Sequence, residues 1–454
     1  MARSGDAAIL RGDLMGALVA AVITISESVP LGLMTFAALG TAFAGMGVIA
    51  GLYGAVAAGL VAALLGGTPR MISGPRASVA VIMASMVATA AQAPDLDQHG
   101  GPATAVALAL FGVFLAGLLQ GIFGIARLGR VIKFIPYPVI EGFMNGVAIL
   151  LLLSQMRGLL GLPEHFAWAD WSDIRAEASP WGIIVAGVTM LVITIAPKIT
   201  RRAPSLLIGL LAGLALHYAL RPYVGAALLG PTIGAVPSAI PSFALFEIWD
   251  VASDTWIIDR IAALMPHVAI LAVIAAIDSL MGAAVVDSLT AGRHNSDREL
   301  LAQGLSNMAS AAVGGLASSG AVGRSAAALK AGAQTRRSAV ISALFVLVGT
   351  IVAGPWLGYL PRSVLAAVLT VVALGIMDSW SRELLSRLRL AGPFRRAIAA
   401  NLVIVIAVGA VTVIVNLITA VIAGIMIAMV MFVRDMSKSI VRRSYDGAAR
   451  RAGR

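Results

Sequence analysis

The stretch Leu316 to Ala333, LASSGAVGRSAAALKAGA, decides how the rest of this chain is interpreted. Its Ser319-Gly320 pair precedes a short apolar run that ends before Lys330, and Ser and Gly are common where a helix begins. A helix beginning near Ala321 would rise only about 15 Å, half of the roughly 30 Å hydrocarbon core of a bilayer. We therefore expect a half-helix that begins inside the membrane.

A similar stretch occurs earlier, in Arg70 to Ala84, RMISGPRASVAVIMA. Here Ser73-Gly74 precedes Pro75, and proline is tolerated at the first helical position because that N–H has no intrahelical acceptor. A helix that begins in mid-membrane leaves N–H groups unpaired, which lipid permits only beside a protein-lined cavity. Two such N-termini facing each other, each carrying about +0.5 charge, would form a site for an anion.

The composition is that of an integral membrane protein. Of the 454 residues, 59% are hydrophobic and 12% are charged, whereas a soluble domain carries about 25% charged residues. The net charge of +11 comes from basic residues in short loops and at the C-terminus, so we expect contact with membrane lipid and no nucleic-acid partner. Because the sequence has no cysteine, disulfides and thiolate metal sites are excluded.

Apolar segments alternate with short joints whose charge predicts their side of the membrane. The acidic joints Ala93 to Gly101 and Glu164 to Glu177 are expected outside, and the basic joints near Arg127, Lys198 and Arg382 to Arg396 are expected inside. This alternation gives about fourteen segments with both termini cytoplasmic. It predicts an all-α, multi-pass protein of the cell inner (plasma) membrane.

Two parts of this chain do not fit a simple alternation. The first span, Leu14 to Leu39, contains Ser26-Glu27-Ser28 and Pro30, which we expect to interrupt it. The proline-containing segment Arg221 to Asp259 is expected outside, and the sequence does not indicate its fold.

The two halves of the chain share a second pattern besides the Ser-Gly pair. Ile135-Pro136-Tyr137-Pro138-Val139-Ile140 is echoed by Leu360-Pro361-Arg362-Ser363-Val364-Leu365, and in each half this segment follows the Ser-Gly segment. Seven segments per half is an odd number, so the halves would insert with opposite orientation. Inverted repeats that meet at broken helices are typical of a secondary transporter with its site near the bilayer midplane.

Several ordered motifs over Leu14 to Ser437 resemble the SulP sulfate permease and anion transporter family. The residues that carry the resemblance are Ser73-Gly74-Pro75, Tyr137-Pro138-Val139-Ile140-Glu141-Gly142, Ala276-Ile277-Asp278-Ser279-Leu280, Asp287, Gly292-Arg293-His294-Asn295, Glu299-Leu300, Gln303-Gly304-Leu305-Ser306-Asn307, Gly314-Gly315 and Arg324-Ser325.

The resemblance implies a seven-plus-seven inverted repeat within a transmembrane part, residues 1–437. It implies a core domain of about residues 14–130 and 266–355, and a gate domain of about 135–220 and 360–433. Two half-helices, preceded by short extended stretches, would frame the anion site. Family members usually continue into a cytoplasmic STAS domain. Here residues 438–454 are expected to be a basic cytoplasmic tail, which is too short to form such a domain.

The sequence departs from the family pattern at positions that bear on the substrate and the coupling ion. Pro30 is followed by Leu31 and not by the polar Gln that the family often has, which removes one substrate contact. Sodium-coupled members carry hydroxyl side chains at the positions of Gly282 and Val322. Because a sodium ion needs several oxygen ligands, we expect proton coupling here.

Three carboxylates are candidates for carrying the coupling proton, since an acid inside a membrane segment is costly and indicates function. We expect Asp278 to face the site; the alternative is a structural group held by hydroxyls such as Ser279 or paired with Arg324. Glu27, beside the expected break before Pro30, and Glu141, at a segment start, are further candidates. An ordinary interfacial position is the alternative for Glu141.

The substrate-binding candidates surround the two half-helix starts. Arg324 would add to the anion field or neutralise Asp278, with a structural ion pair as the alternative. Arg76 either makes the site more cationic, favouring a divalent anion, or faces away. The neutral donors are expected to be Ser73 and Ser319 with the N–H groups of Ala77, Ala321 and Val322.

The function expected from these features is proton-coupled uptake of a small anion, sulfate first, by movement of the core domain against the gate domain. Bicarbonate, a dicarboxylate and a uracil-like molecule remain alternative substrates, and an uncoupled anion channel is a different class. Asp278 distinguishes the transporter from the channel, which needs no titratable group. We expect no enzymatic activity, cofactor or metal; the oligomeric state is open, with a homodimer as one alternative.

Overall fold

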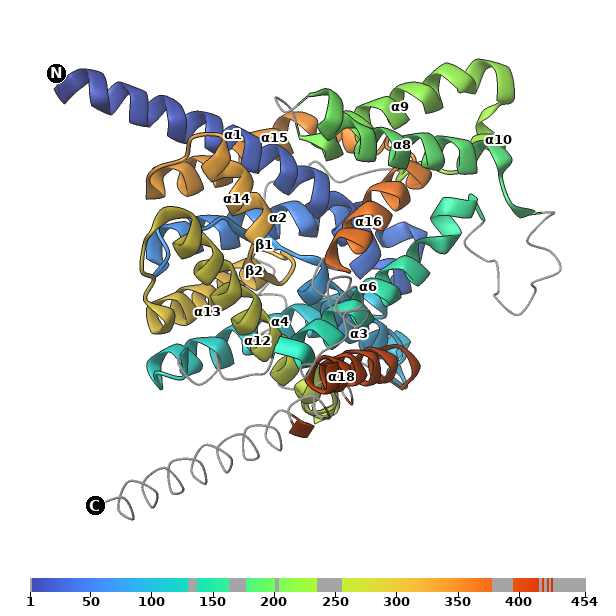
Figure 1. The fold of residues 1–454 in the computed structure, drawn as a ribbon. Helices are drawn as coiled ribbons and strands as arrows, with labels where there is room; N and C mark the ends of the chain where they lie inside the picture. Colours follow the sequence, from blue (N-terminus) through green and yellow to red (C-terminus); the bar gives the residue numbers. More distant parts are fainter. Residues whose placement is uncertain are drawn as a thin grey trace, which may run out of the picture. The chain divides into compact units, whose positions relative to one another are not determined.

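Over the residues that it describes, the computed structural model consists of helices and their connections, with two short strands (Figure 1). It describes residues 2–129, 137–162, 177–200, 204–234, 255–377 and 395–415, with residues 419, 423, 426 and 427. The strands are β1 (Ser73–Pro75) and β2 (Ser318–Gly320). The α-helices are α1 (Ala2–Thr35), α2 (Ala44–Leu65), α3 (Ala77–Ala91), α4 (Pro102–Ile125), α6 (Tyr137–Leu160), α8 (Pro180–Ile199), α9 (Ser205–Val224), α10 (Ala226–Leu229), α12 (Thr255–Thr290), α13 (Ser296–Ala312), α14 (Val322–Lys330), α15 (Arg336–Leu357), α16 (Arg362–Ile376) and α18 (Arg395–Ile414).

The helices have the length and surface of membrane-spanning segments. Among the described residues, 8 helices are long and apolar enough to cross a bilayer. Large apolar side chains are exposed on helices such as α8, where Ile184 and Leu191 are 45% and 57% accessible, and α15, where Ile351 is 63% accessible. Exposed side chains of this kind suit contact with lipid tails. The predicted all-α, multi-pass class is confirmed.

The chain forms two compact units. One consists of residues 1–133 and 150–375, and the other of residues 134–149 and 376–454. In the second unit the first half of α6 packs closely on α18. A Cβ added at Gly142 would lie 2.8 Å from the carbonyl oxygen of Val405, and one added at Gly146 would lie 2.4 Å from Cβ of Thr412. Of the expected last segment, Val415 to Phe432, only residues 415, 419, 423, 426 and 427 are described, and the basic tail lies outside the described ranges.

The first helix differs from the expectation at Pro30. We expected a break there, but α1 continues through Pro30 to Thr35. Close packing on α2 accompanies this continuity: a Cβ added at Gly32 would lie 1.9 Å from the carbonyl oxygen of Gly47, and one added at Gly51 would lie 2.2 Å from that of Ser28. Packing of two backbones at this distance stabilises the helix despite the amide N–H that proline lacks.

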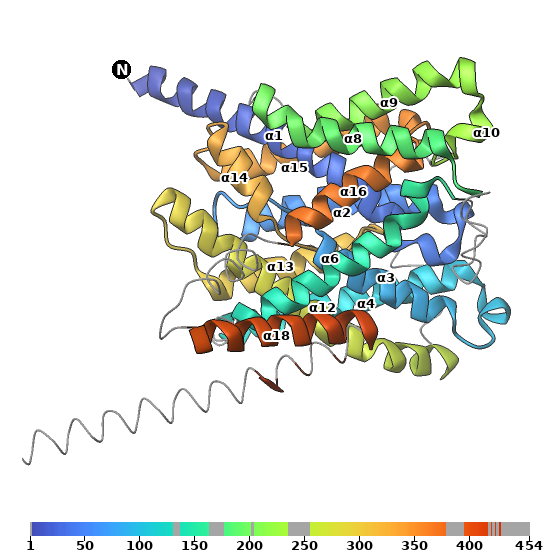
Figure 2. The ribbon, with the colours of Figure 1, turned by 45° about the vertical axis from the view of Figure 1, so that its right-hand side comes forward.

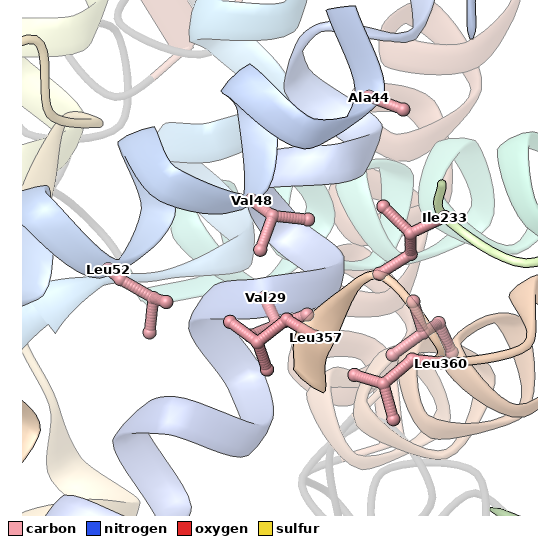
Figure 3. Close-up of a cluster of buried hydrophobic side chains, with 8 residues drawn as sticks. Val29, Ala44, Val48, Leu52, Ile233, Leu357 and Leu360 are labelled. Atoms are coloured by element: carbon pink, nitrogen blue, oxygen red, sulfur yellow. The ribbon is translucent and has the colours of Figure 1, made fainter. Parts of the chain in front are cut away.

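An apolar cluster packs α1 and α2 against Ile233 and against the end of α15 (Figure 3). Val29 of α1 and Val48 of α2 meet Ile233, Leu357 and Leu360, and all five side chains are buried. Figure 2 shows α8 and α9 side by side in the same unit, where they pack directly on each other. Part of the expected external segment is described: α9 runs to Val224 and α10 follows, whereas residues 235–254 are outside the described ranges.

Candidate functional site

The two Ser-Gly stretches lie side by side as a pair of antiparallel strands (Figure 1). Ser73 pairs with Gly320 and Gly74 with Ser319, and every residue of both strands is buried. The backbone N–H of Ala321 extends the pairing by donating to the carbonyl oxygen of Ile72 at 2.8 Å. The two expected extended stretches are therefore a single structure that joins the two halves of the chain.

Each strand leads directly into a short helix. α3 begins at Ala77, so Pro75 is a strand residue and not the first helical residue that we expected. α14 begins at Val322, next to the expected start near Ala321, and includes Lys330, before which we expected it to end. Arg76 and Ala321, the residues before the two helices, are extended, and neither makes a side-chain cap. Because the strands are antiparallel, the two helices leave the strand pair at its opposite ends, α3 after Pro75 and α14 after Gly320. The first-turn N–H groups of both helices therefore begin at the two ends of one short strand pair.

Helix α13 fixes both strands through polar side chains spaced four residues apart. Nε2 of Gln303 donates to Oγ of Ser73 at 2.7 Å and to Oε1 of Glu299 at 2.9 Å. Asn307 lies one turn further along. Its Nδ2 donates to the carbonyl oxygen of Ser318 at 3.1 Å, and its Oδ1 accepts from the Ser318 N–H at 2.8 Å. This helix thus determines the position of the strand pair.

Asp278 lies in α12 beside the starts of both half-helices and is 4% accessible. Its Oδ2 accepts hydrogen bonds from the hydroxyls of Ser78 and Ser319, the latter at 3.3 Å. The hydroxyl of Ser279, which we had considered as a partner, donates to the carbonyl oxygen of Ala275. Asp278 therefore faces the region between the half-helices, with donors from each side.

Arg324 is fully buried at 1% accessibility, and its partner is not the one we considered. Its Nε donates to Oε2 of Glu27 at 2.9 Å, and its Nη2 donates to the carbonyl oxygen of Pro75. The alternative pairing with Asp278 is not formed, because the guanidinium is directed toward α1. Glu27 and Arg324 thus form an ion pair that links α1 to the start of α14.

Arg76 is the arginine that lies near Asp278. Its Nη1 is 4.0 Å from Oδ2 of Asp278 and donates to the carbonyl oxygen of Gly320 at 3.1 Å. Its side chain is 24% accessible. The guanidinium thus reaches from the start of α3 to the strand that leads into α14.

The remaining expected site residues fall in three groups. Ser73 and Ser319 belong to the strand pair, and their hydroxyls bond Gln303 and Asp278. The expected backbone donors are Ala77 and Val322, at the helix starts, and Ala321, whose N–H is bonded to Ile72. Glu141 lies in the first turns of α6 in the other unit and is 5% accessible, so it is not at an exposed position.

The supporting side chains of α13 received no role from the sequence. Glu299, Gln303 and Asn307 are all at most 2% accessible. A pattern of polar residues at i, i+4 and i+8 in a membrane helix places them on one face, and that spacing could have indicated a buried polar contact. Ser78 was missed because a lone serine in an apolar helix is not distinctive.

A separate cavity of about 350 Å³ lies near the ends of α1, α6 and α16. It is lined by residues that include Met34, Phe36, Arg157 and Arg362. No residue of β1, β2, α3 or α14 lines it.

The fold and the paired half-helices define a multi-pass membrane transporter. The model of the Sulfate permease family matches residues 10–392, and the chain belongs to this family. It is a transporter of small anions and not an enzyme.

Known proteins similar to the chain are transporters by name. It is 32% identical to "Bicarbonate transporter BicA" of a Picosynechococcus species over 94% of this chain and 71% of that protein. It is 29% identical to "Putative sulfate transporter YvdB" of Bacillus subtilis over 94% of this chain and 74% of that protein. The solved transmembrane domain of a cyanobacterial BicA superposes with a TM-score of 0.73 at 28% identity, covering 89% of this chain and 97% of that domain.

Proposed function

We propose that this protein takes up a small anion, sulfate first, together with protons. The observation that carries the proposal is the placement of Arg76 and Asp278 beside the strand pair from which α3 and α14 start. A cationic fork, a carboxylate and two helix N-termini converge there, which is the chemistry needed to bind an anion and a proton together. We propose that the anion binds between the two helix starts.

Asp278 is the group that we propose carries the proton. A carboxyl group buried in a membrane helix marks proton relays in pumps and transporters. Glu27 is paired with the buried guanidinium of Arg324 at 2.9 Å, so we propose that it holds Arg324 in place. Glu141 remains a candidate for a second proton-binding group, in the other unit.

The proposed transport cycle moves a core domain, about residues 14–130 and 266–355, against a gate domain, about residues 135–220 and 360–433. The half-helices and α12 all belong to the proposed core, so the bound anion would move with them. We also propose that the protein resides in the plasma membrane with both termini in the cytoplasm, from the basic residues in the joints expected inside.

Bicarbonate is the second candidate substrate, because a relative named as a bicarbonate transporter is 32% identical to this chain. Against sodium-coupled bicarbonate transport stands Gly282, which has no hydroxyl and whose added Cβ would lie 3.4 Å from the carbonyl oxygen of Gly320. Its position beside the strand pair therefore supplies no side-chain oxygen for a sodium ion. A dicarboxylate is a further candidate substrate, which would require a larger site.

Uptake of labelled sulfate into proteoliposomes tests the proposal. We expect an inward proton gradient to accelerate uptake, and Asp278→Asn to remove that acceleration while sulfate exchange is retained in part. Asp95→Asn is the matched control, because Asp95 is an exposed acid in the loop between α3 and α4. Unchanged gradient dependence in Asp278→Asn would reject the coupling role. Uptake without any gradient dependence in the unmodified protein would favour an uncoupled channel.

A further inference from the structure

The Arg76 guanidinium lies at the proposed anion site. Its guanidinium extends from the start of α3 and is hydrogen-bonded to the carbonyl oxygen of Gly320, immediately before the start of α14. Asp278 lies 4.0 Å away. A carboxylate and a substrate oxyanion are chemically alike, since each accepts hydrogen bonds from the same guanidinium fork.

Arg324, the other arginine near the helix starts, is not available to bind the anion. Arg324 is held by Glu27 on one side and by the carbonyl oxygen of Pro75 on the other, and it is 1% accessible. Freeing it would leave a buried charge without a partner, which is strongly unfavourable. Arg76 has a single carbonyl hydrogen bond and 24% of its side chain accessible. It is the cation that can exchange one partner for another.

The charge at the helix starts depends on the protonation of Asp278. Glu27 and Arg324 cancel, the two helix N-termini contribute about +0.5 each, and Arg76 contributes a full charge. With Asp278 ionised, the sum is about +1, and with Asp278 protonated it is about +2. Only the protonated site therefore matches a divalent anion.

Among the described elements that pack on α12, no other charge changes this sum. Of the elements packed on α12, α3 and its cap contribute Arg76, and α4 and β2 contribute no charged residue. α14 contributes Arg324, paired with Glu27, and Lys330 at its far end. The charged residues of α13, Asp297, Arg298 and Glu299, lie in its first turn, whereas Asn307, which bonds β2, lies toward the other end of that helix.

We propose that Arg76 links proton binding to anion binding by exchanging the Asp278 carboxylate for the substrate. A proton from the external solution binds Asp278, the carboxylate becomes a neutral carboxyl group, and the guanidinium turns to two oxygens of the anion. Release of the anion and of the proton on the inner side restores the pair. This inference rests on the proposed function and narrows its substrate to oxyanions, since the parallel N–H groups of the fork match two oxygens of an oxyanion, whereas a halide presents a single atom to them.

Equilibrium binding of sulfate to the purified protein, measured by calorimetry in two buffers of different ionisation enthalpy, counts the protons taken up per anion. We expect the unmodified protein to bind sulfate more tightly at acidic pH, with net proton uptake. We expect Arg76→Gln to lose this uptake and to bind sulfate about tenfold to a hundredfold more weakly at acidic pH, the loss of a charge-assisted contact. Lys330→Gln, at the exposed far end of α14, is the matched control and keeps both properties.

Arg76→Lys keeps the charge and removes the fork. This variant should retain proton uptake but lose the preference for sulfate over chloride. If Arg76→Gln does not fold, this loss of preference tests the role of Arg76. Either variant behaving like the unmodified protein in both affinity and proton uptake overturns the role of Arg76. Absence of sulfate binding or of proton uptake in the unmodified protein would instead overturn the proposed function.

Discussion

Substituting Gly74 by alanine adds one methyl group at the centre of the site. The added Cβ would lie 2.6 Å from Nη1 of Arg324 and 3.8 Å from Cα of Ala55. Arg324 cannot move aside without breaking its bonds to Glu27 and to the carbonyl oxygen of Pro75. Inserting a methyl group into a packed core typically costs about 1–3 kcal/mol, and breaking the buried ion pair would cost about 3–5 kcal/mol. We therefore expect the strand to shift and the protein to lose about 1–3 kcal/mol of stability.

Thermal unfolding in detergent and sulfate binding on the same sample measure this effect. Gly74→Ala should unfold several degrees lower than the unmodified protein and bind sulfate more weakly, because the starts of α3 and α14 are displaced. Gly354→Ala is the control: Gly354 is also buried, but no heavy atom lies within 4 Å of an added Cβ. A Gly74→Ala protein with the melting temperature and affinity of the unmodified protein would refute the reasoning.

Two further substitutions test the supporting contacts. Asn307→Ala removes two hydrogen bonds to Ser318 and one to Gln120. At about 1 kcal/mol each, their loss should lower the free energy of unfolding by about 3 kcal/mol, and an unchanged melting temperature would mean that Asn307 is not needed to hold β2. Glu27→Gln leaves Arg324 buried without a counter-ion and should cost about 3–5 kcal/mol, whereas Glu27→Gln combined with Arg324→Gln should cost less than the sum of the two single changes; additive effects in thermal unfolding would contradict the pairing.

Much of the site could be predicted from the sequence because its signals are local. A Ser-Gly pair before an apolar run too short to cross the bilayer indicates a helix that begins in the membrane, and both stretches contain it. The pairing of β1 with β2 was not predicted, because it joins residues about 250 positions apart in the chain. Asp278 was placed at the site because a carboxylate in an apolar helix is itself an unusual signal.

The partners of the two arginines could not be predicted, because they depend on how distant helices pack. Arg324 and Asp278 are both close to the strand pair, yet the guanidinium turns to Glu27 of α1. The sequence placed Glu27 beside a break in α1, whereas the helix is continuous and presents that carboxylate to α14. Propensity at Pro30 was outweighed by the close approach of α1 to α2, which no local pattern encodes.

The position of a bound anion tests the central claim most directly. Selenate is a heavier analogue of sulfate, so its selenium can be located by anomalous diffraction from crystals grown at acidic pH. We predict a selenate within hydrogen-bond distance of the Arg76 guanidinium and the first-turn N–H groups of α3 and α14. Selenate bound only elsewhere, for example in the cavity lined by Arg157 and Arg362, would contradict the account.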